Sequence, residues 1–529
     1  MRAVKLVLIL THRYLGIPLS LLFVMWFVSG FFMIYTGGMP KVTPDMQVDG
    51  EEAVDFAKVT VTPQQAMTAA GYEPPAATLR TILDRPVYEL ADPGYGSTFV
   101  YADTGELMPT LTPEQGLELA SRFLAIPAER FHLQQTLENQ VDQWTFTVRR
   151  ELPLYKYVAD DALDTEVYVS QSQAKVSAYT TRTSRLLAWL GTIPHWLYFE
   201  TLRENQKLWT NTVVWSSEIG CVVALLGLCL GVTQFRKVKP FVLAKAIPYR
   251  GLMRWHYILG CIFGVVTLTW VFSGLVSMEP WEWTNAQGVR IKRDVLTGGD
   301  LRLQEFPAPA SADWKSLSEY PIKQLEFTRV LAAPYWVAEF APVHDGLGGK
   351  RDRLHQPYNI DGQLQAQAIV VDATTGKAQK NFDAVQLAAA LGAGVEGAAI
   401  TETAQLDDYD DYYYSRGNQL PLPVLRVKFD DANRSWVYVD PLRGTVLSVV
   451  HRWSRLERWL YNGLHSLDFA FWYHKRPLWD IGVLLLLSGG LATSVLGLYF
   501  GLRRLKHDIT QAFSKIAGKK TAGDVSHVV

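Results

Sequence analysis

The sequence predicts an α-helical membrane protein whose four main transmembrane helices arise from an internal duplication, with α+β domains between the helices. The first observation is a set of four apolar runs, at about 12–36, 209–235, 254–278 and 478–502. Each run has the roughly 20 residues needed to cross a hydrocarbon core. The other two observations are residues that recur at constant offsets and short strand patterns that recur between the runs.

Two sets of residues recur without gaps. His12, Gly16, Trp26, Ser29 and Gly30 match His256, Gly260, Trp270, Ser273 and Gly274 at an offset of 244. His195, Trp209, Gly220, Gly227 and Gly231 match His465, Trp479, Gly490, Gly497 and Gly501 at an offset of 270. We therefore interpret the chain as two copies of one unit, and each copy carries two histidines next to apolar runs.

Positive charge marks one side of the membrane. The loop 236–250 contains five Lys/Arg residues and no acid, and the tail after Gly501 contains six Lys/Arg residues. The positive-inside rule therefore places both termini and this loop in the cytoplasm, and the stretches 37–190 and 279–460 on the outer side. Because the basic residues cluster at the membrane edge, a nucleic-acid partner is not expected.

These boundaries divide the chain in order. The expected parts are a cytoplasmic N-terminus and first transmembrane helix (1–36), a first outer domain (37–190), an interfacial segment and second helix (191–235), a cytoplasmic loop (236–250), a third helix (251–278), a second outer domain (279–460), an interfacial segment and fourth helix (461–502), and a cytoplasmic tail (503–529).

The outer stretches show local signals of an α+β fold. Thr62-Pro63 and Thr112-Pro113 are typical helix starts, with an N-cap threonine before a proline at the first helical position. Alternating or β-branched runs predict strands at 86–90, 98–101, 144–148, 166–169, 335–340, 369–371, 424–429 and 436–440. Several strands lead into Asp-to-Gly turns, such as Asp103-Thr104-Gly105.

These strand pairs with Asp-Thr-Gly turns resemble the PepSY module, a small α+β domain. With the repeated His-x-x-x-Gly spans and the Pro194-His195 and Leu464-His465 stretches, the chain over about 10–505 resembles the PepSY-associated transmembrane family. The resemblance implies PepSY-like periplasmic domains and a multi-pass location in the bacterial inner membrane. The chain is similar to the di-haem ferric-siderophore reductases of that membrane.

The four histidines are the candidate metal ligands. A histidine within or beside a membrane span is costly to leave unpaired, and neutral imidazole is a good ligand of haem iron. His12 and His256 precede spans that run outward, so both lie toward the cytoplasmic face, whereas His195 and His465 lie toward the outer face. We expect each pair to hold one iron, although pairing within each repeat is the alternative. Because no CxxCH motif occurs, two b-type haems are predicted.

Other residues have expected supporting roles. Gly16 and Gly260 lie one helical turn after their histidines, where the absence of a side chain leaves room for a flat macrocycle. Arg13 and Arg254 are suited to pair with haem propionates. Ser29, Gly30, Ser273 and Gly274 are expected to allow close helix packing, Trp26 and Trp270 to line the ring edge, and His451 and His474 to be solvated. The run Asp407–Tyr414 is either a solvated acidic loop or a docking surface for a cationic or metal-bearing ligand.

The resemblance implies an inner-membrane di-haem b reductase that passes electrons across the lipid bilayer to a periplasmic ferric siderophore or other Fe(III) chelate. The electron donor would be quinol or a cytoplasmic reductase. No catalytic side chain is expected, since the cofactors carry the redox chemistry. Two alternatives remain: a non-enzymatic PepSY membrane protein that binds peptides or regulates an exported protease, and an accessory of metal uptake.

Overall fold

The chain forms two compact units. The computed structural model describes residues 2–36, 38–94, 96–239, 242–282, 284, 288–292, 294–340, 367–414 and 420–523. The helical unit comprises 1–36, 189–283 and 456–529, and the β-rich unit comprises 37–188 and 284–455.

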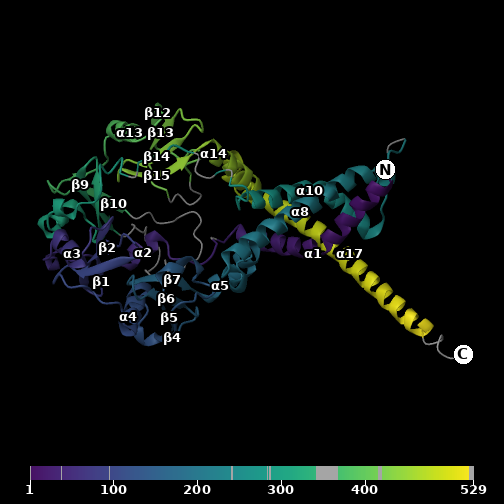
Figure 1. Cartoon of the computed structure of the whole chain (residues 1–529), viewed down its shortest axis with the longest axis horizontal. Coiled ribbons are helices and arrows are strands. Elements are labelled where there is room, and N and C mark those ends of the chain that lie inside the picture. The colour runs from purple at the N-terminus through teal and green to yellow at the C-terminus, as the bar shows by residue number, and fades with distance from the viewer. Residues whose placement is uncertain are drawn as a thin grey trace. The chain divides into compact units, whose positions relative to one another are not determined.

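The helical unit is built from four long helices, α1 (Arg2–Met33), α8 (Gln206–Gln234), α10 (Gly251–Val276) and α17 (Leu478–Gly523). All four are long and apolar enough to cross a membrane, which confirms the predicted spans. Helix α1 packs against α17 and α8, and α10 packs against the same two helices (Figure 1). The shorter elements of this unit are α6 (Thr192–Trp196), α7 (Glu200–Arg203), α9 (Leu243–Ala246), the π-helical turn η6 (Trp459–Gly463), α15 (Leu464–Ser466) and α16 (Ala470–Tyr473).

The fourth long helix continues beyond the end of its apolar run. The run was expected to end near 502, but α17 continues to Gly523. Seven of the fifteen residues 503–517 are Leu, Lys, Arg or Ala, which favour a helix, and the stretch contains no glycine or proline to stop it. Hydropathy therefore locates the membrane-crossing part of this helix but not its end.

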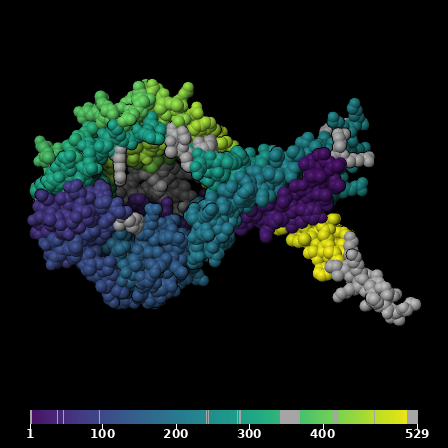
Figure 2. Space-filling view, viewed as in Figure 1, coloured from purple at the N-terminus to yellow at the C-terminus, as the bar shows by residue number. Residues whose placement is uncertain are grey.

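One seven-stranded antiparallel sheet joins the two long segments of the β-rich unit. Its order is β11 (Ala378–Gln379), β10 (Gln367–Asp372), β9 (Ala333–Phe340), β8 (Ile322–Val330), β1 (Ala77–Ile82), β2 (Arg85–Ala91) and β3 (Ser97–Tyr101). Strand β1 of the first segment pairs with β8 of the second, with Leu79 opposite Leu325. In Figure 2 the surface of the first segment, in purple, accordingly meets that of the second, in teal. The stretches 37–190 and 279–460, expected as two domains, thus share a sheet.

Two four-stranded antiparallel sheets complete the unit. One contains β4 (Phe131–Leu137), β5 (Leu154–Ala159), β6 (Glu166–Ser170) and β7 (Lys175–Thr180), and the other contains β12 (Ile400–Leu406), β13 (Val424–Phe429), β14 (Trp436–Asp440) and β15 (Thr445–Val450). The helices of this unit are α2 (Pro44–Gly50), η1 (Phe56–Lys58), α3 (Pro63–Ala70), α4 (Pro113–Leu124), η2 (Ala128–Arg130), η3 (Phe146–Glu151), η4 (Leu303–Glu305), η5 (Pro309–Ser311), α11 (Trp314–Leu317) and α13 (Ala384–Ala393). Helices α5 (Arg182–Leu190) and α14 (Arg452–Arg458) follow the last strands of the two sheets.

Local sequence signals explain most of these elements. Thr62 and Thr112 each accept a hydrogen bond from the backbone N–H three residues on, and the glutamine at that position bonds back, so both form complete capping boxes. The expected Asp-to-Gly turns are present, with Gly105 and Gly376 at positive φ. Seven of the eight expected strands form, with ends within two residues of those predicted.

The prediction of a strand at 144–148 is wrong. This stretch leads into the 3₁₀ helix η3, and the neighbouring strand is β5. The Asp142 carboxylate accepts hydrogen bonds from the Trp144 backbone N–H at 3.0 Å and from the Thr145 hydroxyl at 3.0 Å. A side chain that bonds its own backbone two residues on offers the chain a turn in place of a sheet ladder, so the alternating pattern does not decide the conformation here.

Arg80 fastens two sheets to each other. Its side chain lies on β1, is only 4% exposed, and donates to the carbonyl oxygens of Gln173 at 2.9 Å and Ala174 at 3.3 Å, between β6 and β7. It also bonds Glu89 at 2.8 Å and lies 3.8 Å from buried Glu51. Burial raises the pKa of Glu51, and Arg80 opposes this rise.

We expect Arg80→Met to destabilise the β-rich unit by about 3–5 kcal/mol, because it leaves the buried Glu51 without its cation. Lys58→Gln is the matched control, since the Lys58–Asp55 pair is about half exposed on both sides and such pairs contribute about 0–1 kcal/mol. Urea unfolding of the purified full chain, followed by near-ultraviolet circular dichroism, measures both. Equal losses of unfolding free energy in the two variants would show that Arg80 does not stabilise the contact between the sheets.

Candidate metal centre

Two of the four predicted ligand histidines lie next to each other in the structure, with their rings nearly perpendicular. His195 is in α6 and His465 is in α15, and their ring centroids are 6.0 Å apart with an angle of 73° between the ring planes. Both side chains are half-buried. The structure therefore brings together the pair that was expected at the outer face, although the two residues are 270 positions apart in the sequence.

A tight chain reversal follows each of these histidines. Leu197 and Leu467 have φ values of +53° and +51°, a left-handed conformation that leucine rarely adopts. Two indoles hold the reversals: Trp209 Nε1 donates to the Trp196 carbonyl at 2.8 Å, and Trp479 Nε1 donates to the Leu467 carbonyl at 3.0 Å. The tryptophans that recur 14 residues after each histidine therefore fix the loops that present the imidazoles.

The Nδ1 atoms of the outer pair are bound to the long helices. His465 Nδ1 lies 3.1 Å from both the Trp270 carbonyl and the Ser273 hydroxyl on α10. His195 Nδ1 lies 3.0 Å from the Ser29 hydroxyl on α1, and the Trp26 backbone also bonds this ring. Each serine hydroxyl donates to the carbonyl three residues before it. Ser29 and Ser273 were expected only to allow close packing, so sequence reasoning missed this role.

The inner histidines use the same arrangement. His12 Nδ1 lies 3.0 Å from the Val223 carbonyl on α8, and His256 Nδ1 lies 3.2 Å from the Thr493 carbonyl on α17. Val223 and Thr493 occupy corresponding positions at the offset of 270. His256 lies close enough to His12 for a charge on one ring to act on the other. Both inner histidines are thus anchored like the outer ones, each to a helix of its own half.

A glycine one turn further along the helix exposes each of these carbonyls. Gly227 follows Val223 by four residues, and a Cβ placed on it would lie 2.9 Å from the His12 Cε1. A Cβ on Gly497, four residues after Thr493, would lie 3.5 Å from the His256 Cε1. Positions four apart share a helix face, so a side chain at 227 would displace the His12 ring, whereas a methyl group at 497 would make ordinary van der Waals contact with the His256 ring.

In the outer pair, only His465 has such a glycine next to its ring. A Cβ on Gly274, four residues after Trp270, would lie 3.6 Å from the His465 Cε1, whereas the corresponding Gly30 faces Leu487. The signal in the sequence was the recurrence of these glycines, but it did not say what they contact.

This bonding sets which ring nitrogen is available. A carbonyl oxygen can only accept a hydrogen bond, so Nδ1 must carry the proton in every ring that bonds one. In the neutral imidazole Nε2 then has a free lone pair. Metal-binding histidines commonly bond a carbonyl through the other nitrogen in this way. The donor set is therefore four imidazoles whose tautomer suits coordination through Nε2.

Further observations fit a bound haem. Trp26 Nε1 and Trp270 Nε1 are buried and have no hydrogen-bond partner among the described residues, so each could donate to a group held between the helices. A Cβ on Gly16 would meet nothing within 4 Å, and one on Gly260 would meet only Thr493 at 3.9 Å, which leaves the room expected beside both inner histidines. Arg13 is exposed and Arg254 is half-buried, and their expected propionate contacts stay a prediction.

The remaining sequence expectations have mixed outcomes. His474 is exposed, as expected, but His451 is only 6% exposed and its Nε2 lies 2.9 Å from the Thr284 carbonyl. The assignment of His451 to the solvated surface was thus wrong, because its ring is buried and bonded to the backbone of Thr284. In the run Asp407–Tyr414, Asp410 bonds Arg426 at 2.8 Å and Tyr413 is 1% exposed. This part of the run stabilises the fold around β12–β15.

We expect Gly227→Ala to weaken retention of the inner cofactor by about tenfold or more, the effect typical of disturbing a residue that orients a metal ligand. The new methyl group would push His12 away from the Val223 carbonyl. Gly231→Ala is the matched control on the same helix, because its Cβ would lie 2.8 Å from the Cys261 Sγ and not from a histidine. Haem b per purified chain is the measurement, and equal losses in both variants would reduce the effect to general helix packing.

No protein-family model matches the chain, and no curated protein matches it. The functional conclusion therefore depends on the four histidines and the residues that contact them.

Proposed function

We propose that this protein is a membrane reductase that holds two b-type haems, one between His195 and His465 and one between His12 and His256. It would pass electrons across the bacterial inner membrane to an Fe(III) chelate such as a ferric siderophore. The observation that carries this proposal is the outer pair, whose rings are 6.0 Å apart and whose Nδ1 atoms are both bonded to serine hydroxyls on the long helices.

The separation of the outer rings suits one iron between them. A metal–imidazole nitrogen bond is about 2.0–2.1 Å long, so two such bonds plus half of each ring give a centroid separation of about 6 Å. A direct hydrogen bond between the two imidazoles would instead need an Nδ1 or Nε2 proton directed at the partner, and the bonds of Nδ1 to α1 and α10 make Nδ1 unsuitable. Separation and tautomer thus support coordination independently.

The residues of the chain would orient and shield the cofactors. Bis-imidazole haem iron, when bound, supplies one-electron transfer. Ser29 and Ser273 fix the outer rings, while the Val223 and Thr493 carbonyls fix the inner ones. The two buried Trp Nε1 donors would bond polar groups of the outer cofactor. Since no CxxCH motif is present, neither haem would be covalently attached.

The proposed direction of transfer follows from the distribution of charge. With Lys/Arg-rich segments in the cytoplasm, His12 and His256 lie near the donor side, where quinol or a cytoplasmic reductase would act. His195 and His465 lie near the outer side, where the Fe(III) chelate would accept electrons. Reduction to Fe(II) weakens binding by hard oxygen ligands, so the iron would be released for uptake. The resemblance to PepSY-associated transmembrane reductases supports the same assignment.

We expect the purified wild-type chain to show a sharp reduced α-band and about two haems b, because four imidazoles can ligate two irons. The double variant His195→Ala/His465→Ala should keep about one haem, whereas His12→Ala/His195→Ala should keep almost none. Pairing within each half predicts the reverse order. His132→Ala, on the exposed edge strand β4, is the control. A colourless but folded wild-type protein would refute the proposal.

We expect Ser273→Ala to keep the outer haem bound but to lower its affinity by about 10–100-fold and to shift its reduction potential, since the hydroxyl sets the basicity of His465. Redox titration monitored at the α-band measures the shift. Thr267→Ala is the control, because the buried Thr267 hydroxyl on the same helix donates only to the Phe263 carbonyl. An unchanged potential in Ser273→Ala would contradict a role for this hydroxyl.

A further inference from the structure

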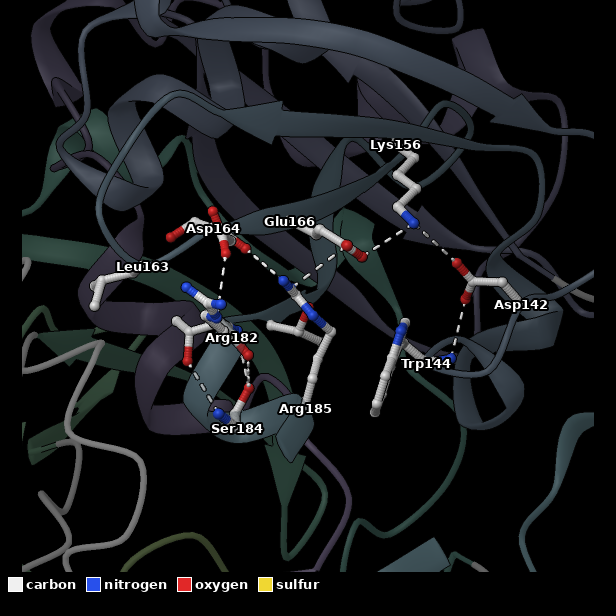
Figure 3. A network of polar contacts seen from close by, with 12 residues as sticks. Asp142, Trp144, Lys156, Leu163, Asp164, Glu166, Arg182, Ser184 and Arg185 are labelled. Atoms are coloured by element: carbon white, nitrogen blue, oxygen red, sulfur yellow. Dashed lines mark hydrogen bonds and ion pairs between the residues drawn. The ribbon is translucent and has the colours of Figure 1, made fainter. Parts of the chain in front are cut away.

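A closed charge network lies on the sheet β4–β7. Lys156 on β5 lies 3.0 Å from Glu166 and 3.5 Å from Asp142, and Arg185 on α5 lies 3.5 Å from the same Glu166 (Figure 3). Arg185 also donates to the Asp164 carbonyl at 2.8 Å. Two cations thus share two carboxylates, with Glu166 at the centre, and the network is neutral.

The sheet β12–β15 has cations at the corresponding positions, but a different residue lies between them. At the offset of 270, Lys156 corresponds to Arg426 and Arg185 corresponds to Arg455. Arg455 donates to the Arg434 carbonyl at 2.8 Å, which is the bond that Arg185 makes to Asp164. The central carboxylate, however, is replaced, because Trp436 stands where Glu166 stands in the first sheet.

Three cations therefore surround an indole and not a carboxylate. The charged ends of Lys428, Arg455 and Arg426 lie 4.3, 4.5 and 5.2 Å from the Trp436 ring centroid. Tyr412 packs edge-on against the same ring at 5.3 Å. We call these five residues the Trp436 surface, and all of them are half-buried, so that a ligand can reach them.

The Trp436 surface carries an excess of positive charge. Within the described part of the chain, its ion pairs are those of Arg426 with Asp410 and Glu402 and that of Lys428 with Glu402. Counted by ion pairs, three cations thus face two carboxylates, where the first sheet has two of each; Asp431 acts on Arg455 only from beyond ion-pair distance. Two further positions are more positive in the second sheet, since Lys428 stands where Val158 stands in the first and Arg434 stands where Asp164 stands.

The two arginines differ in how their charge is compensated. Burial is the largest influence on both and acts to lower their pKa values. Asp410 and Glu402 outweigh it at Arg426 and raise the pKa of that residue, whereas burial prevails at Arg455 and lowers its pKa. A partly desolvated guanidinium with a lowered pKa is stabilised when an anion binds to it, and its planar fork matches carboxylate or catecholate oxygens.

We propose that the Trp436 surface binds an anionic ligand with flat aromatic rings, and, on the basis of the proposed function, that this ligand is an Fe(III) chelate of the catecholate class. The cations would contact the anionic oxygens, and Trp436 and Tyr412 would contact the ring faces and edges. A neutral hydroxamate chelate would gain little from this surface. The sheet β4–β7, with Glu166 in place of the indole, would not bind such a ligand.

The test uses a gallium(III) tris-catecholate, which is anionic and is not reduced, and a neutral gallium(III) tris-hydroxamate of similar size. Calorimetric titration of the full chain in detergent measures both. We expect Trp436→Glu, which restores the residue type of the first sheet, and Arg455→Gln each to raise the Kd of the catecholate chelate by about tenfold or more. Neither should change the binding of the hydroxamate chelate.

Arg182→Gln is the matched control, because it removes one cation whose side chain is 78% exposed on α5 and should leave both affinities unchanged. Wild-type binding that is no tighter for the catecholate than for the hydroxamate, or equal losses for both chelates, would overturn the proposal. Circular dichroism checks the fold of each variant, and Arg455→Gln keeps the test decisive if Trp436→Glu does not fold. Since gallium binding needs no haem, absence of haem would refute the proposed function and leave this result standing.

Discussion

The arrangement of the membrane helices depends on a hydrogen bond from a histidine ring to a helix carbonyl. A carbonyl inside a helix already accepts one intrahelical bond, but its second lone pair is available when the side chain one turn further on is absent. Gly227 and Gly497 provide that opening for His12 and His256. The same bond fixes the tautomer and anchors each of these two histidines to its own half, and without it the inner imidazoles would be unpaired polar groups in an apolar bundle.

The outer histidines lie next to strained backbone. Both belong to short helices outside the long spans, and both are followed by a leucine at positive φ, a conformation that costs about 1–3 kcal/mol. The indole bonds of Trp209 and Trp479 and the serine bonds of Ser29 and Ser273 offset that strain. Rings held at a fixed separation lose little freedom on coordination, which suits the proposed electron-transfer site.

The β-rich unit divides stability and recognition between two similar sheets. In β4–β7 the cations are neutralised by Glu166 and Asp142, so the network can only stabilise the fold. In β12–β15 an indole replaces the central carboxylate while the surrounding cations remain. The nearby acidic run, for which the sequence left open a solvated loop or a docking surface for a cationic or metal-bearing ligand, supplies Asp410 to Arg426. The charge that remains for a ligand is therefore positive.

The sequence by itself determined the four spans, seven of the eight strands, the capped helices and the histidines, because each rests on hydropathy, period or local hydrogen bonding over a few residues. It could not determine that His195 meets His465, that Ser29 bonds an imidazole, or that β1 pairs with β8. Those contacts join residues about 160 to 270 positions apart, and recurrence shows that positions correspond without showing what they touch. Only packing decided which carbonyl each ring reaches and which cations lie around the Trp436 ring.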